Sequence, residues 1–224
     1  MDPTTKNEIW SNKDSTEGII GITQLLTPKS ILNVAFTFGN DSGYLSDPYR
    51  LAQYFPTDIP NWPAGFFIGV PERRPAHRNK EIIYTSLTQY FEKVDASLEG
   101  SYRFYNDSYG VVANTVGLTW NQWLGKHFIA SPFVRLYEQS AADFYQVTFY
   151  GPYTTNPGGY HSSDYRLSEL YTTDVGLQTT VVVNDHIHIN AGYHRYEMHG
   201  LDGKTSSAMY PKANVFNIGL SFVW

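Results

Sequence analysis

The chain has 224 residues, a formal net charge of -5 and 17% charged residues, fewer than the roughly 25% usual in soluble domains. Its 18 Tyr, 13 Phe and 5 Trp exclude a disordered chain, and its lack of Cys excludes a disulfide scaffold, a thiolate metal site and a Cys enzyme. The acidic balance excludes nucleic-acid binding by bulk charge, so we expect no nucleic-acid partner.

Residues 1–15 are polar and lack the basic start and apolar run of a secretory signal, so we expect no signal peptide in this sequence. From residue 16 onward, apolar and polar residues alternate, which is typical of strands with one apolar face. The alternation predicts nine strands, at about 16–26, 31–39, 81–91, 96–105, 109–120, 128–137, 174–182, 186–197 and 215–224. Most have roughly 10 residues, enough to cross a bilayer at a tilt of about 45°, whereas soluble sandwiches use about 5–6. No segment has the roughly 18 consecutive apolar residues of a membrane-spanning helix.

The connections between these strands alternate between tight turns and longer loops. The two longest loops, 40–80 and 138–167, lie at the same end of the predicted sheet, and GFFIGV at 65–70 predicts a small strand within the first. Outer-membrane barrels have this asymmetry, with short periplasmic turns and long extracellular loops. We therefore predict an all-β fold, an antiparallel up-and-down transmembrane β-barrel at 16–224 after a polar segment at 1–15, in the bacterial outer membrane.

The number of strands leaves two possibilities open. Bacterial single-chain barrels have an even number of strands, whereas nine are predicted here. The chain is either the C-terminal nine to ten strands of a larger barrel, or residues 1–15 add a short strand and the chain closes alone. The polar character of residues 1–15 favours the first possibility.

The last strand carries the most specific local signal. Apolar side chains occupy every second position up to a terminal aromatic residue: Phe216, Ile218, Leu220, Phe222 and Trp224. This pattern resembles the C-terminal signal that the barrel-assembly machinery reads on outer-membrane proteins, so that machinery and the lipid bilayer are expected partners. The alternative is an edge strand of a soluble barrel.

The other faces of the strands carry polar and charged side chains, which would face the lumen of a barrel. These are Glu99, Arg103, Arg135, Asp174, His188 and His194. Such charges could line a pore and tune its ion preference, or they could pair and fill a narrow interior. The sequence leaves both interpretations open.

Chemistry at a metal or a nucleophile has little support. His186 and His188 share a strand face, but two histidines at this spacing lack a third ligand, so we expect no bound metal. The Gly-x-Ser-x-Gly spacing of serine hydrolases is absent. We therefore expect no cofactor, no catalytic residue and no enzymatic activity.

Five strings occur in order along the chain: GYLSDPYR (43–50), ERRPAHR (72–78), YRFYNDSYG (102–110), SPFVRLYEQSAADFY (131–145) and SSDYRLSE (162–169). On these strings the chain resembles a family of predicted bacterial outer-membrane proteins defined only as a domain of unknown function, number thirty-five seventy. The resemblance covers most of 16–224. It implies a secreted outer-membrane β protein that is normally longer at its N-terminus and starts with a signal peptide, so this chain departs from it by lacking an N-terminal half.

The resemblance also implies neighbouring genes for a small lipoprotein and for a thioredoxin-like or flavin-transfer protein. Periplasmic or lipoprotein partners are therefore expected. No activity is established for the family, so no catalytic residue is carried over to this chain.

The same strings bring opposite charges to the loop-rich end of the predicted sheet. Ser46-Asp47-Pro48 is a turn signal just beyond the strand at 31–39. We hypothesise one ion-paired network at the extracellular mouth, formed by Asp47, Arg50, Arg73, Arg74, Asp143, Asp164 and Arg166. Such a network would brace the loops over the mouth or bind an anionic or polar ligand.

These patterns support three functions in decreasing order. The first is a non-enzymatic outer-membrane channel or envelope scaffold, the second a soluble β-barrel that binds a ligand such as a glycan, and the third an outer-membrane enzyme. The first requires six apolar residues to form an outward belt, whereas the second requires the same residues to form a core: Phe36, Leu98, Val134, Leu177, Ile189 and Leu220.

Overall fold

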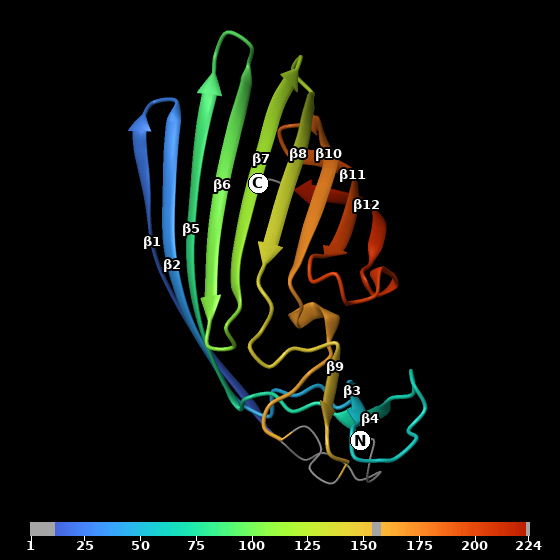
Figure 1. Ribbon diagram of the computed structural model, residues 1–224. Coiled ribbons are helices and arrows are strands. Elements are labelled where there is room, and N and C mark those ends of the chain that lie inside the picture. The colour runs from blue at the N-terminus through green and yellow to red at the C-terminus, as the bar shows by residue number, and fades with distance from the viewer. Residues whose placement is uncertain (1–11, 154–157, 223–224) are drawn as a thin grey trace.

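The computed structural model describes residues 12–153 and 158–222, and most of them lie in strands. Nine strands form one antiparallel sheet in the order β1-β2-β5-β6-β7-β8-β10-β11-β12 (Figure 1). Their bounds are β1 Lys13–Thr27, β2 Ser30–Gly43, β5 His77–Phe91, β6 Ala96–Asp107, β7 Val112–Leu124, β8 Phe128–Gln139, β10 Leu170–Asn184, β11 Ile187–Gly200 and β12 Lys212–Phe222. The up-and-down antiparallel order confirms the predicted fold class.

The strands are longer than the alternation of apolar residues predicts. β1 begins at Lys13 instead of residue 16, because Lys13 and Asp14 pair with Gly43 and Ser42 at the end of β2. These strand ends are polar, and hydrophobic alternation cannot detect a strand beyond its apolar part. The loops predicted at 40–80 and 138–167 are accordingly shorter, at 44–76 and 140–169.

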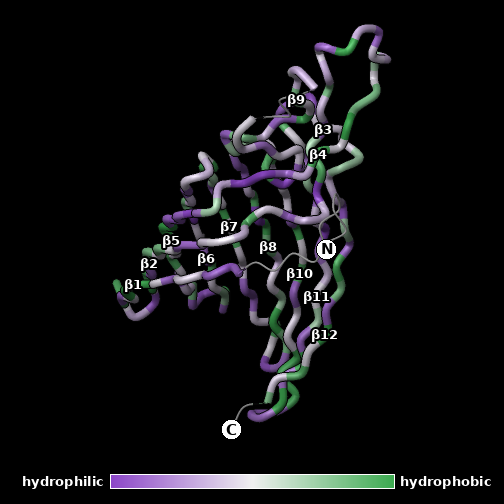
Figure 2. Tube along the Cα trace, turned by 90° about the horizontal axis from the view of Figure 1, so that it is seen from below, coloured by the Kyte–Doolittle hydropathy of each residue, from purple (hydrophilic) through white to green (hydrophobic). Residues whose placement is uncertain are grey.

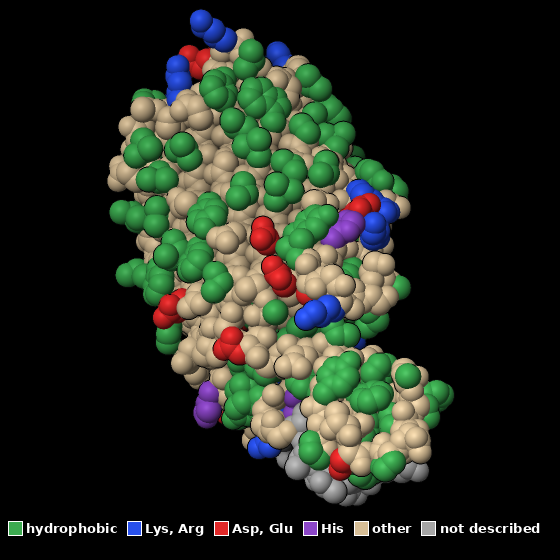
Figure 3. All heavy atoms as spheres, in the orientation of Figure 1, with side chains coloured by type: hydrophobic (Ala, Val, Ile, Leu, Met, Phe, Trp, Pro, Cys, Tyr) green, Lys and Arg blue, Asp and Glu red, His purple; other side chains and the backbone are tan. Residues whose placement is uncertain are grey.

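One face of the sheet is apolar and exposed, and we call it the apolar face. Phe36, Leu177, Ile189 and Leu220 are 43%, 44%, 38% and 62% exposed. The pairing register places Leu98 and Val134 on the same face, where both are partly exposed. Hydrophobic side chains spread over the sheet in Figure 3, and hydrophobic and hydrophilic residues alternate along the strands in Figure 2. The six residues therefore form an exposed belt and not a core, and such a large apolar surface marks a membrane or protein contact.

A second, three-stranded sheet joins the two long loops. Its order is β4 (Ile68–Pro71), β3 (Leu51–Pro56) and β9 (Thr148–Gly151), with β3 and β9 parallel. We call the described residues of 44–76 and 140–169, which also include the 3-10 helix η1 (Tyr165–Leu167), the loop platform. The strand predicted at 65–70 is β4, two to three residues shifted at its start. β3 and β9 were not predicted, because neither lies in an alternating segment of useful length.

The loop platform has two small cores of its own. One packs Tyr109, Val111, Ala142, Phe144 and Leu167 together, with Tyr105 of β6 against them. The other packs Ala52, Tyr54 and Val70. Figure 1 shows the platform at one end of the large sheet, the end opposite the tight turns.

The platform covers the face opposite the apolar belt, which we call the polar face. In β7 and β10, Ala113 and Leu170 are only 1% and 2% exposed, whereas their neighbours Val112 and Tyr171, on the apolar face, are exposed. Because side chains alternate between faces along a strand, this contrast shows which side the loops cover. The loops fold over the polar face and leave the apolar face free.

The two outermost strands, β1 and β12, do not pair with each other in the part of the chain that the structure describes. Self-closure with a strand from residues 1–15 is therefore not seen, although residues 1–11 lie outside the described residues. Within residues 12–153 and 158–222, no helix has the length and apolar character needed to cross a membrane. The remaining helix is η2 (Ser207–Met209), a 3-10 turn before β12.

Candidate functional site

A buried ion-pair network lies at the centre of the loop platform. The guanidinium of Arg74 is 2.7 Å from Glu72 Oε1 and 2.9 Å from Asp164 Oδ2, and both carboxylate side chains are only 1% exposed. Ser162 Oγ donates to Glu72 at 2.7 Å, and the backbone N–H of Asp47 donates to the same side chain at 2.5 Å. The network therefore joins the two long loops, and its carboxylates are saturated by donors.

Arg166 extends this network to the surface. Its guanidinium lies 2.5 Å from Asp164 Oδ2 and 3.2 Å from Asp47 Oδ2, and the more distant Arg50 is 4.0 Å from Asp47. Asp164 also caps η1 by accepting from the backbone N–H of Arg166 at 3.1 Å. Burial raises the pKa of Asp164, but the hydrogen bonds from Arg166 outweigh it and hold the pKa below its ordinary value.

Two residues of the hypothesised network lie elsewhere. Arg73 pairs through its backbone with His161, so its side chain points away from those of Glu72 and Arg74 and lies 5.9 Å from the ring centroid of Tyr160. The side chain of Asp143 lies against Gly110 at the turn between β6 and β7. The structure thus brings together Asp47, Arg50, Arg74, Asp164 and Arg166, and adds Glu72, which the hypothesis omitted. The role of this network, bracing or binding, stays a prediction.

A second buried carboxylate, Asp107, was not among the predicted site residues. It accepts from Arg78 Nε at 2.7 Å, from the Tyr105 hydroxyl at 2.6 Å and from the backbone N–H of Tyr109 at 2.9 Å. The Arg78 guanidinium also lies 4.7 Å from the Tyr109 ring centroid. Burial raises the pKa of Tyr109 to about 12, so this phenol stays neutral. These contacts fasten the turn after β6 to the start of β5.

The six residues predicted to face a lumen share the polar face by their pairing register. Arg103 pairs with Thr115 beside Tyr137, Arg135 pairs with Asp174, and His188 pairs with Val182. Asp174 Oδ1 lies 2.5 Å from His194 Nδ1. Glu99, Arg103 and Arg135 make no ion pair within the described residues. The polar face therefore combines a carboxylate–imidazole pair with two arginines that lack a carboxylate partner there.

A cavity of about 350 Å³ lies where the polar face meets the loop platform. Arg135, Tyr137, Asp174 and Tyr196 of the sheet line it, together with Arg166 of the platform. Its lining is polar and aromatic, so it suits water and a polar solute better than an apolar ligand.

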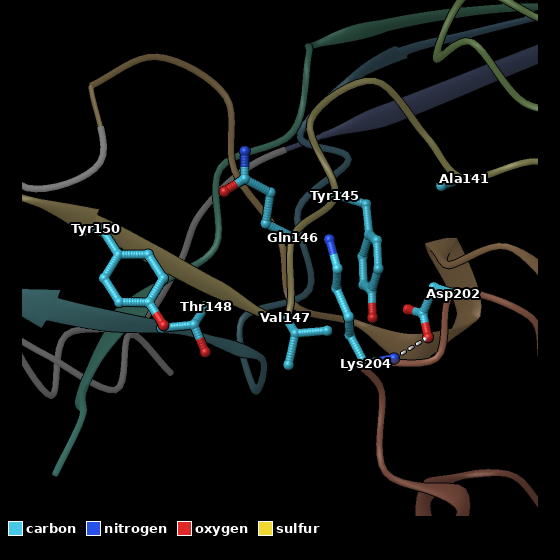
Figure 4. A pocket seen from close by; sticks show the side chains of 8 residues that line it. All are labelled: Ala141, Tyr145, Gln146, Val147, Thr148, Tyr150, Asp202 and Lys204. Atoms are coloured by element: carbon cyan, nitrogen blue, oxygen red, sulfur yellow. Dashed lines mark hydrogen bonds between the residues drawn. The ribbon is translucent and has the colours of Figure 1, made fainter. Parts of the chain in front are cut away.

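A larger cavity of about 690 Å³ lies between the platform and the loop that joins β11 and β12 (Figure 4). Tyr145, Asp202 and Lys204 lie at one end of it, and Thr148 and Tyr150 at the other. The Tyr145 hydroxyl is 2.5 Å from Thr205 Oγ1, and burial raises the pKa of Tyr145 to about 12. Sequence reasoning missed this cavity because its lining comes from two loops without periodic patterns.

The remaining predicted groups can be placed briefly. Phe216, Ile218, Leu220 and Phe222 lie on the apolar face and are 62–86% exposed, whereas Trp224 lies outside the described residues. Among the residues that the structure describes, no group of three or more His, Asp or Glu side chains could hold a metal ion.

Long antiparallel strands in up-and-down order, an exposed apolar face, a polar face and loops gathered at one end define an outer-membrane β-barrel type of fold. In agreement, the structure is similar to OmpT (in-vitro folded), an outer membrane protein of Vibrio cholerae, with a TM-score of 0.53 and 10% sequence identity. The likeness covers 95% of this chain but 56% of that protein, so the chain spans about half the length of its structural neighbour.

The chain belongs to the family described as protein of unknown function (DUF3570), whose model matches residues 3–224. The family resemblance expected from the five sequence strings is thereby confirmed. Among proteins of curated function, none matches the chain.

Proposed function

We propose that the chain forms part of the wall of a non-enzymatic channel in the bacterial outer membrane, with its mouth narrowed by the loop platform. The observation that carries this proposal is the coverage of the polar face. At the loop end of β7 and β10, alternate residues on the polar face are buried under the platform while their neighbours on the apolar face stay exposed. A solute moving along the polar face would have to pass this contact.

The chemistry of the constriction supports a polar route. Arg135 and Asp174 of the sheet lie across a cavity of about 350 Å³ from Arg166 of the platform. Side chains of both signs at such a point favour hydrated or charged solutes over apolar ones. The carboxylates of Glu72, Asp107 and Asp164 each accept hydrogen bonds from arginine, which suits bracing better than acid–base catalysis.

Thiol labelling of the reconstituted protein tests the channel, because the chain has no native Cys. Ser131→Cys places one thiol on the polar face of β8, and Ala130→Cys places it on the apolar face of the same strand. We expect a charged, water-soluble thiol reagent to reduce the conductance of planar bilayers containing the Ser131→Cys protein and to leave the Ala130→Cys protein unaffected. Equal effects on the two, or no conductance from the unlabelled protein, would reject the channel.

A scaffold is the second candidate, because the platform exposes aromatic rings on its outer side. Tyr49, Phe66 and Tyr150 are 80%, 65% and 68% exposed. Exposed aromatic rings on a braced surface are typical of protein contacts. A scaffold would show no conductance in the experiment above, and substituting these three residues by Ser would abolish capture of its partner without changing the strand content.

A further inference from the structure

A charged cluster interrupts the apolar face at one place, on β11 and β12. Arg195 Nε lies 2.9 Å from Glu197 Oε1, while His199 Nε2 and Lys212 Nζ lie 3.2 Å and 3.4 Å from Glu197 Oε2. Arg195 also donates to Asn214 at 3.1 Å. Three basic side chains therefore share one carboxylate, and we call these four residues the basic cluster.

The register places the basic cluster directly beyond the apolar belt. On the apolar face of β11, Ile189, Ala191 and Tyr193 are followed by Arg195, Glu197 and His199. The rings of Tyr193 and Phe216 pack at 4.8 Å between centroids just before the change from apolar to charged residues. Aromatic rings of this kind mark the interface of a membrane, so the basic cluster lies at the depth of the lipid head groups.

The sign of the charge is unusual for this face. In the nine described strands of the sheet, Lys and Arg occur on the apolar face only at 195 and 212, whereas Glu81 and Glu138 occupy the loop ends of β5 and β8. Figure 3 shows basic, acidic and His side chains gathered over β12, at the border of the hydrophobic surface. The three basic groups are partly exposed and exceed the charge of Glu197.

We propose that the basic cluster binds the phosphate of an anionic membrane lipid. Arg and Lys side chains are the usual donors to phosphate oxygens, with Arg able to offer two parallel N–H groups. The acyl chains of a lipid held there would lie along Tyr193, Phe216 and Ile218, which are exposed directly below the cluster. The inference rests on the membrane position of the sheet and not on a channel, so it stands even if the protein conducts nothing.

Native mass spectrometry of the protein in neutral detergent tests the proposal, with dioleoyl phosphatidylglycerol as the probe and dioleoyl phosphatidylcholine as the zwitterionic reference. We expect phosphatidylglycerol to bind more tightly, and the double substitution Arg195→Gln with Lys212→Gln to weaken that binding about tenfold or more, since each basic residue near a membrane surface contributes about fivefold. Lys93→Gln with Lys126→Gln is the matched control, because it removes two charges from the tight turns at the opposite end. Unchanged lipid binding in the first variant, or an equal loss in the control, would overturn the proposal.

Two further measurements complete the test. Glu197→Gln leaves the three basic groups and removes their carboxylate, so we expect it to bind phosphatidylglycerol more tightly, a gain that misfolding cannot imitate. Inorganic phosphate at the same concentration should not displace the lipid. If phosphate displaces it fully, the cluster recognises a free anion and not a membrane lipid.

Discussion

Asp164 holds the loop platform together at the scale of single residues. It accepts hydrogen bonds from two arginines, and its side chain is almost fully buried. Removing one partner of a buried ion pair is costly because the other charge stays behind without compensation. Exposed pairs such as Arg50 with Asp47 have much less effect, since water screens them.

We expect Asp164→Asn to lower the local free energy of unfolding of the platform by about 3 kcal/mol. The side chain keeps its size, but Arg74 and Arg166 lose their shared negative partner. Limited proteolysis, followed by mass spectrometry of peptides from residues 44–76 and 140–169, measures this opening free energy. Arg50→Gln is the control and should change it by less than about 1 kcal/mol.

The depressed pKa of Asp164 predicts how the platform responds to acid. Its folded pKa is below the value of 3.8 expected in the unfolded chain, so its contribution is fully present above about pH 4 and is lost as the pH falls through the folded pKa. We expect protease resistance of the platform to stay constant from pH 7 to about pH 4 and to fall below that. A platform that loosens between pH 7 and pH 5 would contradict this assignment, and Asp164→Asn should remove the acid step.

At the scale of elements, the turn between β6 and β7 depends on a glycine. Gly110 has φ of +82°, and a Cβ there would lie 2.2 Å from Asp143 Oδ1. Gly125, in the turn between β7 and β8, has φ of +72° and open space around it. Both turns need a left-handed residue, but only the first is also closed by a neighbouring side chain.

We therefore expect Gly125→Ala to destabilise the protein by about 1 kcal/mol, from backbone strain alone. Gly110→Ala should cost at least about 1 kcal/mol more, because it also displaces Asp143. Thermal unfolding in detergent, followed by circular dichroism, compares the two variants. Equal melting temperatures would show that the carboxylate moves aside freely.

The strands of the large sheet were predictable because their apolar residues repeat every second position. The same rule failed where strands continue beyond the apolar belt, as at Lys13, and in the platform, where β3 and β9 are short. The charged strings identified the right loops, but not which arginine would point inward. That choice depends on the backbone pairing of Arg73 with His161, two segments far apart in sequence, and no local pattern encodes it.

At the scale of the whole molecule, the exposed belt predicts how the sheet meets lipid. Leu177 and Gln178 are neighbours in β10, with Leu177 on the apolar face and Gln178 on the polar face. We expect Leu177→Arg to destabilise the protein folded in vesicles by about 2–4 kcal/mol, and Gln178→Arg to have an effect below about 1 kcal/mol. Urea-dependent folding into phosphatidylcholine vesicles measures both. Similar effects would mean that the apolar face does not contact lipid.

The loop platform also has a mechanical consequence for the sheet. It ties the connection between β2 and β5 to the connection between β8 and β10 through the parallel pair β3–β9 and the Arg74–Asp164 ion pair, while β6 and β7 lie between these anchor points. The platform is thus a chord across an arc of strands, and a chord of fixed length sets the curvature of its arc. No such tie joins the tight turns at the other end within the described residues, so the width of the wall is fixed at the loop end and left to the backbone twist of the strands at the other.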